Sequence, residues 1–261
     1  MSPLLVALAF LTILPVPVRP ALSGEEVGRA SAFFPLAGGV QGLILVLAAS
    51  LFTLLLPLPV VAGLVLAVHV LVTGGLHLDG LADSADALAC RGGRERKLMI
   101  MKESRVGAMG VVAVALALIL QARLLEALLA REQAPALAIL FLMPVLGRWA
   151  MVTAMAQAQP ARPEGLGRLF LEHTGRRQLA LASLGAGGLA LAAVALAAGG
   201  WQLAALLAVA SVGLCGLARG IVRLAHQQLG GMTGDTFGAL AVLADLVLLT
   251  VAVAGPGGGP P

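Results

Sequence analysis

The sequence predicts an all-α protein, a polytopic integral membrane helical bundle of about seven transmembrane helices with one short N-terminal helix. Of its 261 residues, 59% are hydrophobic and only 11% are charged. Soluble domains carry about 25% charged residues, so this chain cannot give a soluble globular enzyme a polar surface. Tyr is absent and aromatic residues make up 3%, which argues against an outer-membrane barrel with aromatic belts. The long runs of Leu, Ala, Val and Gly are typical of helices that cross a bilayer.

Each predicted span is an apolar stretch close to the roughly 20 residues that cross a ~30 Å hydrocarbon core. An earlier stretch, Leu4 to Leu14, is too short to cross and is followed by prolines, so we expect a re-entrant or interfacial helix there. We predict a single membrane-embedded domain at 1–254 and a disordered Gly/Pro tail at 255–261. The predicted spans are residues 33–56, 60–79, 107–124, 135–156, 179–198, 201–218 and 236–254.

The basic residues of the loops predict the orientation of the bundle. Fourteen of the 17 Lys and Arg residues fall on one side of the predicted spans, against Arg123 and Arg131 on the other. Because cytoplasmic loops are enriched in Lys and Arg, the richer side is predicted to be cytoplasmic. The net charge of +4 then reflects loops that face anionic lipid, and no nucleic-acid partner is expected. The richer side holds Arg19, Arg29, Arg91, Arg94, Arg96, Lys97, Lys102, Arg105, Arg162, Arg168, Arg176, Arg177, Arg219 and Arg223.

Three aspartates at the end of the second span are the strongest chemical signal. If that helix continues through TGGLHLDGLADSAD, Asp79, Asp83 and Asp86 stand at i, i+4 and i+7 on one face. Three carboxylates on one stripe repel each other unless a cation lies among them, and oxygen ligands suit Mg²⁺ or Mn²⁺. The stripe is therefore a candidate metal site, and a solvated acidic helix end is the alternative interpretation.

His77 is a weaker candidate for the site than the three aspartates. In a continuous helix it lies off the aspartate stripe, but Gly74, Gly75 and Gly80 are places where the helix can break and bring His77 round.

A basic segment follows. Lys102, Ser104 and Arg105 precede Gly107 and Gly110 at a predicted helix start. Cations and free backbone N–H groups at a helix N-terminus form phosphate sites. Basic residues at this place also serve topology, so the phosphate site depends on the neighbouring carboxylates.

Other candidates lie on or near the same side. Arg162 and Glu164 belong to a glycine-punctuated loop, ARPEGLG. Asp235 begins the last span and is either an N-cap or a site residue. Arg148 lies within a span, where an unpaired guanidinium is costly, so a buried acid or a substrate phosphate is expected to meet it.

Asp245 lies in the middle of the last span. We predict that it faces the bundle interior and supports the site, with Arg148 as its leading partner. The alternative is a protonated Asp245 that is hydrogen-bonded to a neighbouring helix. His69, also within a span, is interpreted as a helix-contact residue rather than a ligand.

These residues together predict metal-assisted phosphoryl or phosphodiester transfer at the cytoplasmic membrane face. Carboxylates would hold the metal, Arg and Lys would neutralise phosphate charge, and a carboxylate or a water molecule would help deprotonate an attacking hydroxyl.

Several motifs resemble those of the cobalamin synthase family, the adenosylcobinamide-GDP ribazoletransferases, also called cobalamin-5′-phosphate synthases. They occur in the family's order between residues 5 and 245, and HLDGLAD and TGDT are the specific ones. Two departures are Ala108-Met109, where the family usually has Thr-Phe, and Glu103 in place of a common Asp. The motifs are FLTILPVP, FFPLAGG, GGLHLDGLADSAD, IMKESRVG, ARPEGLG and GGMTGDTFGA.

The resemblance implies the late nucleotide-loop assembly step of cobalamin biosynthesis. The 3′-hydroxyl of α-ribazole, or of its 5′-phosphate, attacks the activated phosphate of adenosylcobinamide-GDP, GMP leaves, and adenosylcobalamin or its 5′-phosphate results. Mg²⁺ is the implied cofactor, at a site that faces the cytoplasm from the bacterial inner membrane. A homo-oligomer is compatible with the sequence.

The family's acidic motif falls on the residues that the stripe selects. Asp79, Asp83 and His77 are the predicted catalytic residues, and Asp79, Asp83 and Asp86 the predicted metal ligands. The predicted substrate-binding residues are Lys102, Ser104, Arg105, Arg148, Arg162, Glu164 and Asp235, with Asp245 in support.

Two other classes are weighed. A CDP-alcohol phosphotransferase also carries spaced aspartates, but Asp83 stands where that family has Arg, and its later G-x-x-x-D-x-x-x-D is absent. A transporter would use Arg148 and Asp245 to line a pathway, but it would not need a carboxylate stripe and phosphate-binding loops on one side.

Overall fold

The computed structural model describes residues 2–17, 19 and 22–255, and this part of the chain forms twelve α-helices and no strand. Six helices are long and apolar enough to cross a membrane, and a seventh crossing is formed if the bent pair α4 and α5 is one span. The six are α3 (Phe34–Phe52), α7 (Ala108–Leu129), α8 (Gln133–Met155), α10 (Arg176–Leu196), α11 (Gly200–Leu229) and α12 (Gly234–Ala254). The predicted multi-pass helical fold is confirmed.

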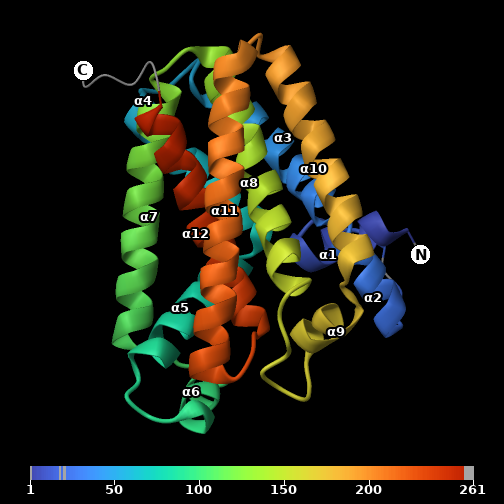
Figure 1. Cartoon of the computed structure of the whole chain (residues 1–261). Helices are drawn as coiled ribbons and strands as arrows, with labels where there is room; N and C mark the ends of the chain where they lie inside the picture. Colours follow the sequence, from blue (N-terminus) through green and yellow to red (C-terminus); the bar gives the residue numbers. More distant parts are fainter. Residues whose placement is uncertain (1, 18, 20–21, 256–261) are drawn as a thin grey trace.

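The second predicted span is wrong at its end. The helix α4 (Leu58–Thr73) stops at Gly74, and α5 (Leu76–Ala89) leaves its direction by 87°. Gly74 and Gly75 both have left-handed backbone conformations, with φ of +60° and +74°, which glycine adopts without strain. Helix α5 lies at one end of the bundle with two short helices, α6 (Arg94–Ile100) and α9 (Leu166–His173) (Figure 1).

The central helix of the bundle is α8, which is buried along most of its length. It packs closely against α3 because glycines remove side chains from the contact. A Cβ atom at Gly38 would lie 2.5 Å from the Pro144 carbonyl oxygen, and one at Gly42 would lie 2.2 Å from that of Phe141. Such small-residue contacts let membrane helices approach backbone to backbone.

The N-terminal segment forms two short helices, α1 (Pro3–Leu11) and α2 (Gly24–Ser31). With nine residues α1 is too short to cross, as predicted, and it buries Val6, Ala7, Leu8 and Leu11. The chain after α1 joins the end of α4 through a hydrogen bond from the Ile13 N–H to the Val72 carbonyl, 2.9 Å. The N-terminal helix therefore borders the bend between α4 and α5.

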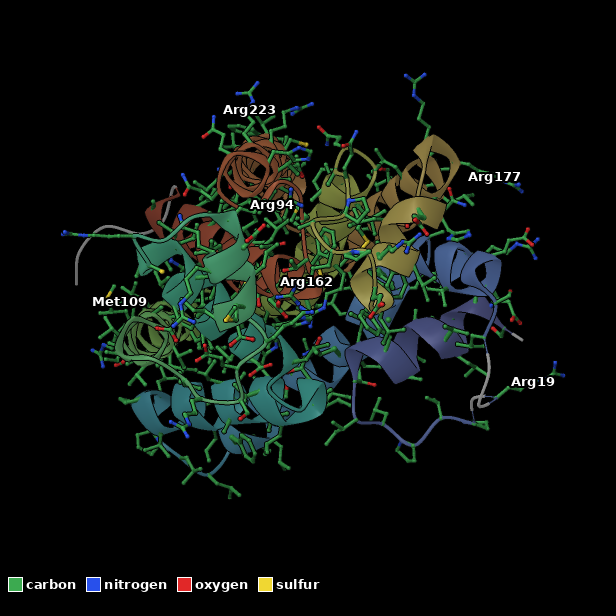
Figure 2. All side chains as sticks on the ribbon, turned by 90° about the horizontal axis from the view of Figure 1, so that it is seen from below. Arg19, Arg94, Met109, Arg162, Arg177 and Arg223 are labelled. Carbon is green, nitrogen blue, oxygen red and sulfur yellow. The ribbon has the colours of Figure 1, made fainter. Side chains whose placement is uncertain are left out.

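The end of the bundle that carries α5, α6 and α9 also carries basic side chains. Figure 2 views this end and shows Arg162 in its interior, whereas Arg177 and Arg223 project from its edge. Arg223 lies on α11, which has 30 residues, about 45 Å, and so extends beyond a ~30 Å core. The loop predicted to begin at residue 219 is therefore wrong, since α11 continues to Leu229. Of the predicted tail, 256–261 lies outside the described residues.

Candidate functional site

After the bend between α4 and α5, helix α5 has one buried face and one more exposed face. His77, Gly80 and Ser84 are buried on one face, whereas Asp79 is exposed and Asp83 is half-buried. The aspartates thus face the end of the bundle, where a water-soluble substrate can reach them.

Close packing of α5 against α12 brings a further carboxylate to the site. A Cβ atom at Gly80 would lie 2.5 Å from the Asp235 carbonyl oxygen, and one at Gly238 would lie 3.2 Å from the Cα atoms of both His77 and Gly80. The two glycines let the helix backbones touch. Asp235, in the first turn of α12, therefore lies beside the α5 aspartates.

Asp235 is not the N-cap of α12. Thr233 takes that role, since its hydroxyl oxygen accepts from the Thr236 N–H at 3.3 Å. The Asp235 carboxylate accepts instead from the Thr233 hydroxyl at 3.3 Å and pairs with the Arg162 guanidinium at 3.5 Å. This geometry favours the site role of Asp235 over the cap role.

Arg162 reaches Asp235 because two loops pair. The Ala161 N–H donates to the Met232 carbonyl at 2.9 Å, and the Met232 N–H donates to the Gln159 carbonyl at 2.8 Å. Arg162 also donates to the Leu98 carbonyl at 3.3 Å, while its buried Nε atom has no hydrogen-bond partner in the part of the chain that the structure describes. The pairing holds a guanidinium in contact with the acidic group.

The carboxylates carry more negative charge than Arg162 offsets. Burial, then the charges of Asp235 and Asp79, raises the pKa of Asp83 to about 6. Arg162 opposes this shift, and Asp86 adds least to it. Asp83 thus interacts more strongly with Asp235, which is far away in the sequence, than with its own helical neighbour Asp86. We call Asp79, Asp83 and Asp235 the acidic cluster.

Asp86 has a different partner. Its carboxylate accepts from the backbone N–H of Gly107 at 2.6 Å and of Gly110 at 2.8 Å, at the start of α7. A Cβ atom at either glycine would lie 2.5 Å from this carboxylate. Asp86 therefore caps α7 with both of its carboxylate oxygens, which argues against the metal role predicted for it. The free N–H groups predicted to bind phosphate there are likewise partly occupied by Asp86.

Two cavities meet at Asp79. One, of about 240 Å³, lies between α5, α8, α9 and α12 and is lined by His77, Asp79, Arg162, Glu164 and Asp235 among others. The other, about 900 Å³, is a groove between α1, the α4–α5 bend and α7, with mostly apolar walls. Phe10, Leu76 and Asp79 line both. Of the acidic cluster, Asp79 is thus accessible from both cavities, Asp235 lines the smaller one, and Asp83 lines neither.

A family model, cobalamin-5-phosphate synthase, matches residues 3–253. The chain belongs to this family. Adenosylcobinamide-GDP ribazoletransferases of Geotalea daltonii and Pseudomonas syringae pv. syringae are 40% and 43% identical over 250 and 260 residues. These alignments cover 95% and 97% of the chain and 96% and 100% of the two relatives. No solved structure matches the chain. The family match favours a synthase over the phosphotransferase and transporter alternatives.

Other residues predicted for this synthase lie away from the cavities. Lys102, Ser104 and Arg105 are exposed in the loop between α6 and α7 and line neither cavity. Their predicted substrate contacts stay a prediction. Arg148 has no exposed surface and lines neither cavity, which argues against the direct substrate contact predicted for it.

Asp245 faces the bundle interior, as predicted, but its hydrogen-bonding partner differs. Its Oδ2 atom lies 3.0 Å from Nε2 of His69, whose Nδ1 atom lies 3.1 Å from the Gln41 side-chain nitrogen. Within the described residues, the three guanidinium nitrogens of Arg148 have no hydrogen-bond partner. Asp245 and Arg148 therefore interact through their charges without a direct hydrogen bond, and His69 is the helix-contact residue that was expected.

Several lining residues were missed from the sequence. Met151 and Met155 stand at i and i+4 on α8, and Arg168 and Phe170 lie on α9. The methionines lie just before the loop that carries Arg162, so their shared helical face was an available signal. The sequence offered no such signal for Phe170, because an apolar residue in a membrane protein usually only packs against its neighbours.

Proposed function

We propose that this protein is an adenosylcobinamide-GDP ribazoletransferase of the cytoplasmic membrane whose site faces the cytoplasm. It joins adenosylcobinamide phosphate to α-ribazole or α-ribazole 5′-phosphate and releases GMP. The observation that carries the proposal is the placement of Asp79 at the junction of two cavities, in one acidic cluster with Asp83 and Asp235, because a transfer between two substrates needs both to reach one charged centre. The family membership and the relatives' names support the reaction.

We propose that the acidic cluster holds Mg²⁺. Its carboxylate oxygens are the ligands that this ion prefers, and burial together with the negative charges of Asp235 and Asp79 raises the pKa of Asp83. Among the described residues, no three acidic, His or Cys side chains already converge as a metal site. This suits Mg²⁺, which keeps several waters and is commonly bound by one or two carboxylates together with substrate phosphates. Asp79 and Asp83 would hold it, with Asp235 beside them.

When bound, Mg²⁺ would neutralise phosphate charge during the transfer. The reaction forms one P–O bond and breaks another: the 3′-hydroxyl oxygen of the acceptor bonds to the phosphorus attached to cobinamide, and the bond from that phosphorus to GMP breaks. The hydroxyl proton moves to a water molecule or to a carboxylate oxygen of the acidic cluster that does not hold the metal. Arg162 supplies positive charge beside the departing phosphate.

The experiment uses the purified protein in liposomes with adenosylcobinamide-GDP and α-ribazole 5′-phosphate. We expect equimolar release of GMP and corrinoid product with Mg²⁺, loss of both with excess EDTA, and recovery when Mg²⁺ is restored. GMP release without a joined product would contradict the transferase, and full activity in EDTA would contradict the metal.

A further inference from the structure

Most of the buried polar atoms that lack a partner belong to three side chains. Within the described residues, eight buried side-chain nitrogen and oxygen atoms have no hydrogen-bond partner, and six of them belong to His77, Arg148 and Asp245. These three residues are exposed by only 4%, 0% and 1%. Because buried polar groups are normally hydrogen-bonded to protein or to ordered water, so many unpaired atoms indicate a bound molecule among them.

The three residues lie where α5 and α8 pack against α12. A Cβ atom at Gly238 of α12 would lie 3.2 Å from the His77 Cα atom. One at Gly147 of α8 would lie 2.9 Å from Oδ1 of Asp245 and 3.6 Å from the Ala241 carbonyl oxygen. Gly238 and Ala241 are three residues apart, about 4.5 Å along the helix axis. Helices α5 and α8 therefore contact neighbouring turns of α12.

Arg148 interacts with both of the other side chains without a hydrogen bond. It directly follows Gly147 and stands three residues before Met151 of the cavity wall, so it lies on the cavity side of α8, about one turn deeper in the bundle. Its positive charge acts on both His77 and Asp245. In the described part of the chain, no nitrogen of its guanidinium has a hydrogen-bond partner. The guanidinium therefore lies farther than a direct hydrogen bond from each of them.

The charges and donors of this group favour water over an ion as the bound molecule. Arg148 and Asp245 carry opposite charges, so an added anion or cation would leave an uncompensated charge in the interior. The guanidinium has five N–H donors, whereas the imidazole of His77 offers at most one acceptor and Oδ1 of Asp245 is another. A water molecule accepts from a donor and donates to an acceptor, so it can join the guanidinium to both.

His77 connects this buried group to the site. It lines the cavity of about 240 Å³ from the buried face of α5, two residues before Asp79. Helix α5 begins after two glycines in left-handed conformations, a backbone that constrains the orientation of the helix weakly. A ring that is held from the bundle interior would fix the rotation of α5 about its axis, and with it the direction in which Asp79 and Asp83 point.

We propose that Arg148 is a positioning residue for the transfer: ordered water molecules join its guanidinium to the ring of His77 and to Oδ1 of Asp245, and so hold the aspartates of α5 toward the cavity. The kinetic consequence rests on the proposed function, whereas the water-bridged contacts do not depend on it. Arg148 lines neither cavity, so it acts on the rate through His77 and not by touching substrate.

The first test removes the guanidinium without leaving a buried charge unpaired. The double variant Arg148→Met/Asp245→Asn replaces both charges by neutral side chains of similar size, a change that folded proteins often tolerate. We expect kcat for GMP release to fall at least about tenfold while the KM of each substrate changes less than about threefold. Arg148→Lys keeps a charge and N–H donors for water, so it should lose less than about threefold in kcat.

Arg131→Met is the matched control. It removes a guanidinium that donates to the Ala252 carbonyl at the other end of the bundle, and it should leave kcat unchanged. Wild-type kcat in the double variant, a KM that rises as much as kcat falls, or an equal loss in Arg131→Met would overturn the positioning role.

The second test asks whether Arg148 acts through His77. In a His77→Leu background, Arg148→Met/Asp245→Asn should lower kcat less than about twofold further, because the ring that Arg148 positions is gone. Losses that multiply would show that Arg148 acts by another route.

A structure at a resolution that shows ordered water tests the bridge itself, and it decides the case if His77→Leu has no measurable rate. We expect at least one ordered water within hydrogen-bond distance of both the Arg148 guanidinium and the His77 ring. A direct Arg148–Asp245 hydrogen bond with no water on His77 would overturn the proposal. Absence of GMP release by the wild type would instead contradict the proposed function, and the structure would still decide the water-bridged contacts.

Discussion

The Nε2 atom of His69 on α4 lies 3.0 Å from the Oδ2 atom of Asp245 on α12, and both side chains are buried. Gln41 of α3 contacts the other ring nitrogen of His69. A Cβ atom at Gly147, next to Arg148 on α8, would lie 2.9 Å from Oδ1 of Asp245. The side chains of Gln41, His69 and Asp245, from three helices, thus form one buried polar network. Asp245 also packs against the backbone of a fourth helix, α8, at Gly147.

The network predicts which pair of residues is energetically coupled. Replacing Asp245 by Ala and His69 by Leu should show a coupling energy of about 0.5–2 kcal/mol in unfolding, because each change removes the other residue's hydrogen bond. Asp245→Ala with Arg148→Gln should show a smaller coupling, since their charges interact without a hydrogen bond. Thermal unfolding in detergent measures both cycles. Additive effects of the His69 and Asp245 changes would show that their contact does not contribute.

The contact between α5 and α12 predicts that a methyl group at Gly80 disrupts the site. Gly80→Ala should separate Asp235 from the α5 aspartates and lower kcat/KM at least about tenfold, because the new Cβ would meet backbone at 2.5 Å. Gly216→Ala in α11 is the control, since nothing lies within 4 Å of its Cβ position. Turnover of the two variants, at equal amounts of folded protein, checks this. Equal activities would mean that the helices tolerate separation.

The sequence predicts the helices well because each span is a local apolar run. The bend after α4 was visible only as an option, since glycines permit a break but tertiary packing decides whether it forms. The partners of Asp86 and Asp245 were not predictable, because their contacts join segments that are distant in the sequence. The same holds for the approach of Asp235 to Asp83, which depends on the packing of two glycines. The sequence thus supplied the aspartates, and the packing of α5, α7 and α12 assigned their partners.

The raised pKa of Asp83 predicts a pH dependence. The ionised carboxylate is lost as pH falls through about 6, so kcat/KM at limiting Mg²⁺ should fall there. The fold should not weaken over this step, because a carboxyl whose pKa is higher in the folded state favours folding when it is protonated. More Mg²⁺ should move the midpoint to lower pH by competing with protons. A pH profile that is flat between 5 and 7 would contradict the role of Asp83.

The basic side chains at one end of the bundle predict that this end faces the cytoplasm. Single cysteines at Arg94, Arg176 and Arg223, in a variant that lacks both native cysteines, should resist impermeant thiol reagents in intact cells. A cysteine at Glu132, at the other end, should react. Permeabilised cells serve as the control, in which all four positions should label. Reaction of any of the first three in intact cells would place the site on the opposite side of the membrane.

Single-turnover GMP release at limiting Mg²⁺ for Asp79→Asn, Asp83→Asn and Asp86→Asn tests most directly whether Asp79 and Asp83 hold the metal. The three changes remove the same charge from one helix at nearly constant shape. We expect the first two variants to lose at least about 100-fold in rate while remaining folded. Asp86→Asn should keep most of the rate, because Asp86 lies outside the acidic cluster and an amide oxygen can still accept from one of the two N–H groups at the start of α7. Near-wild-type rates for Asp79→Asn and Asp83→Asn, or a loss shared equally by all three, would contradict the metal role of Asp79 and Asp83.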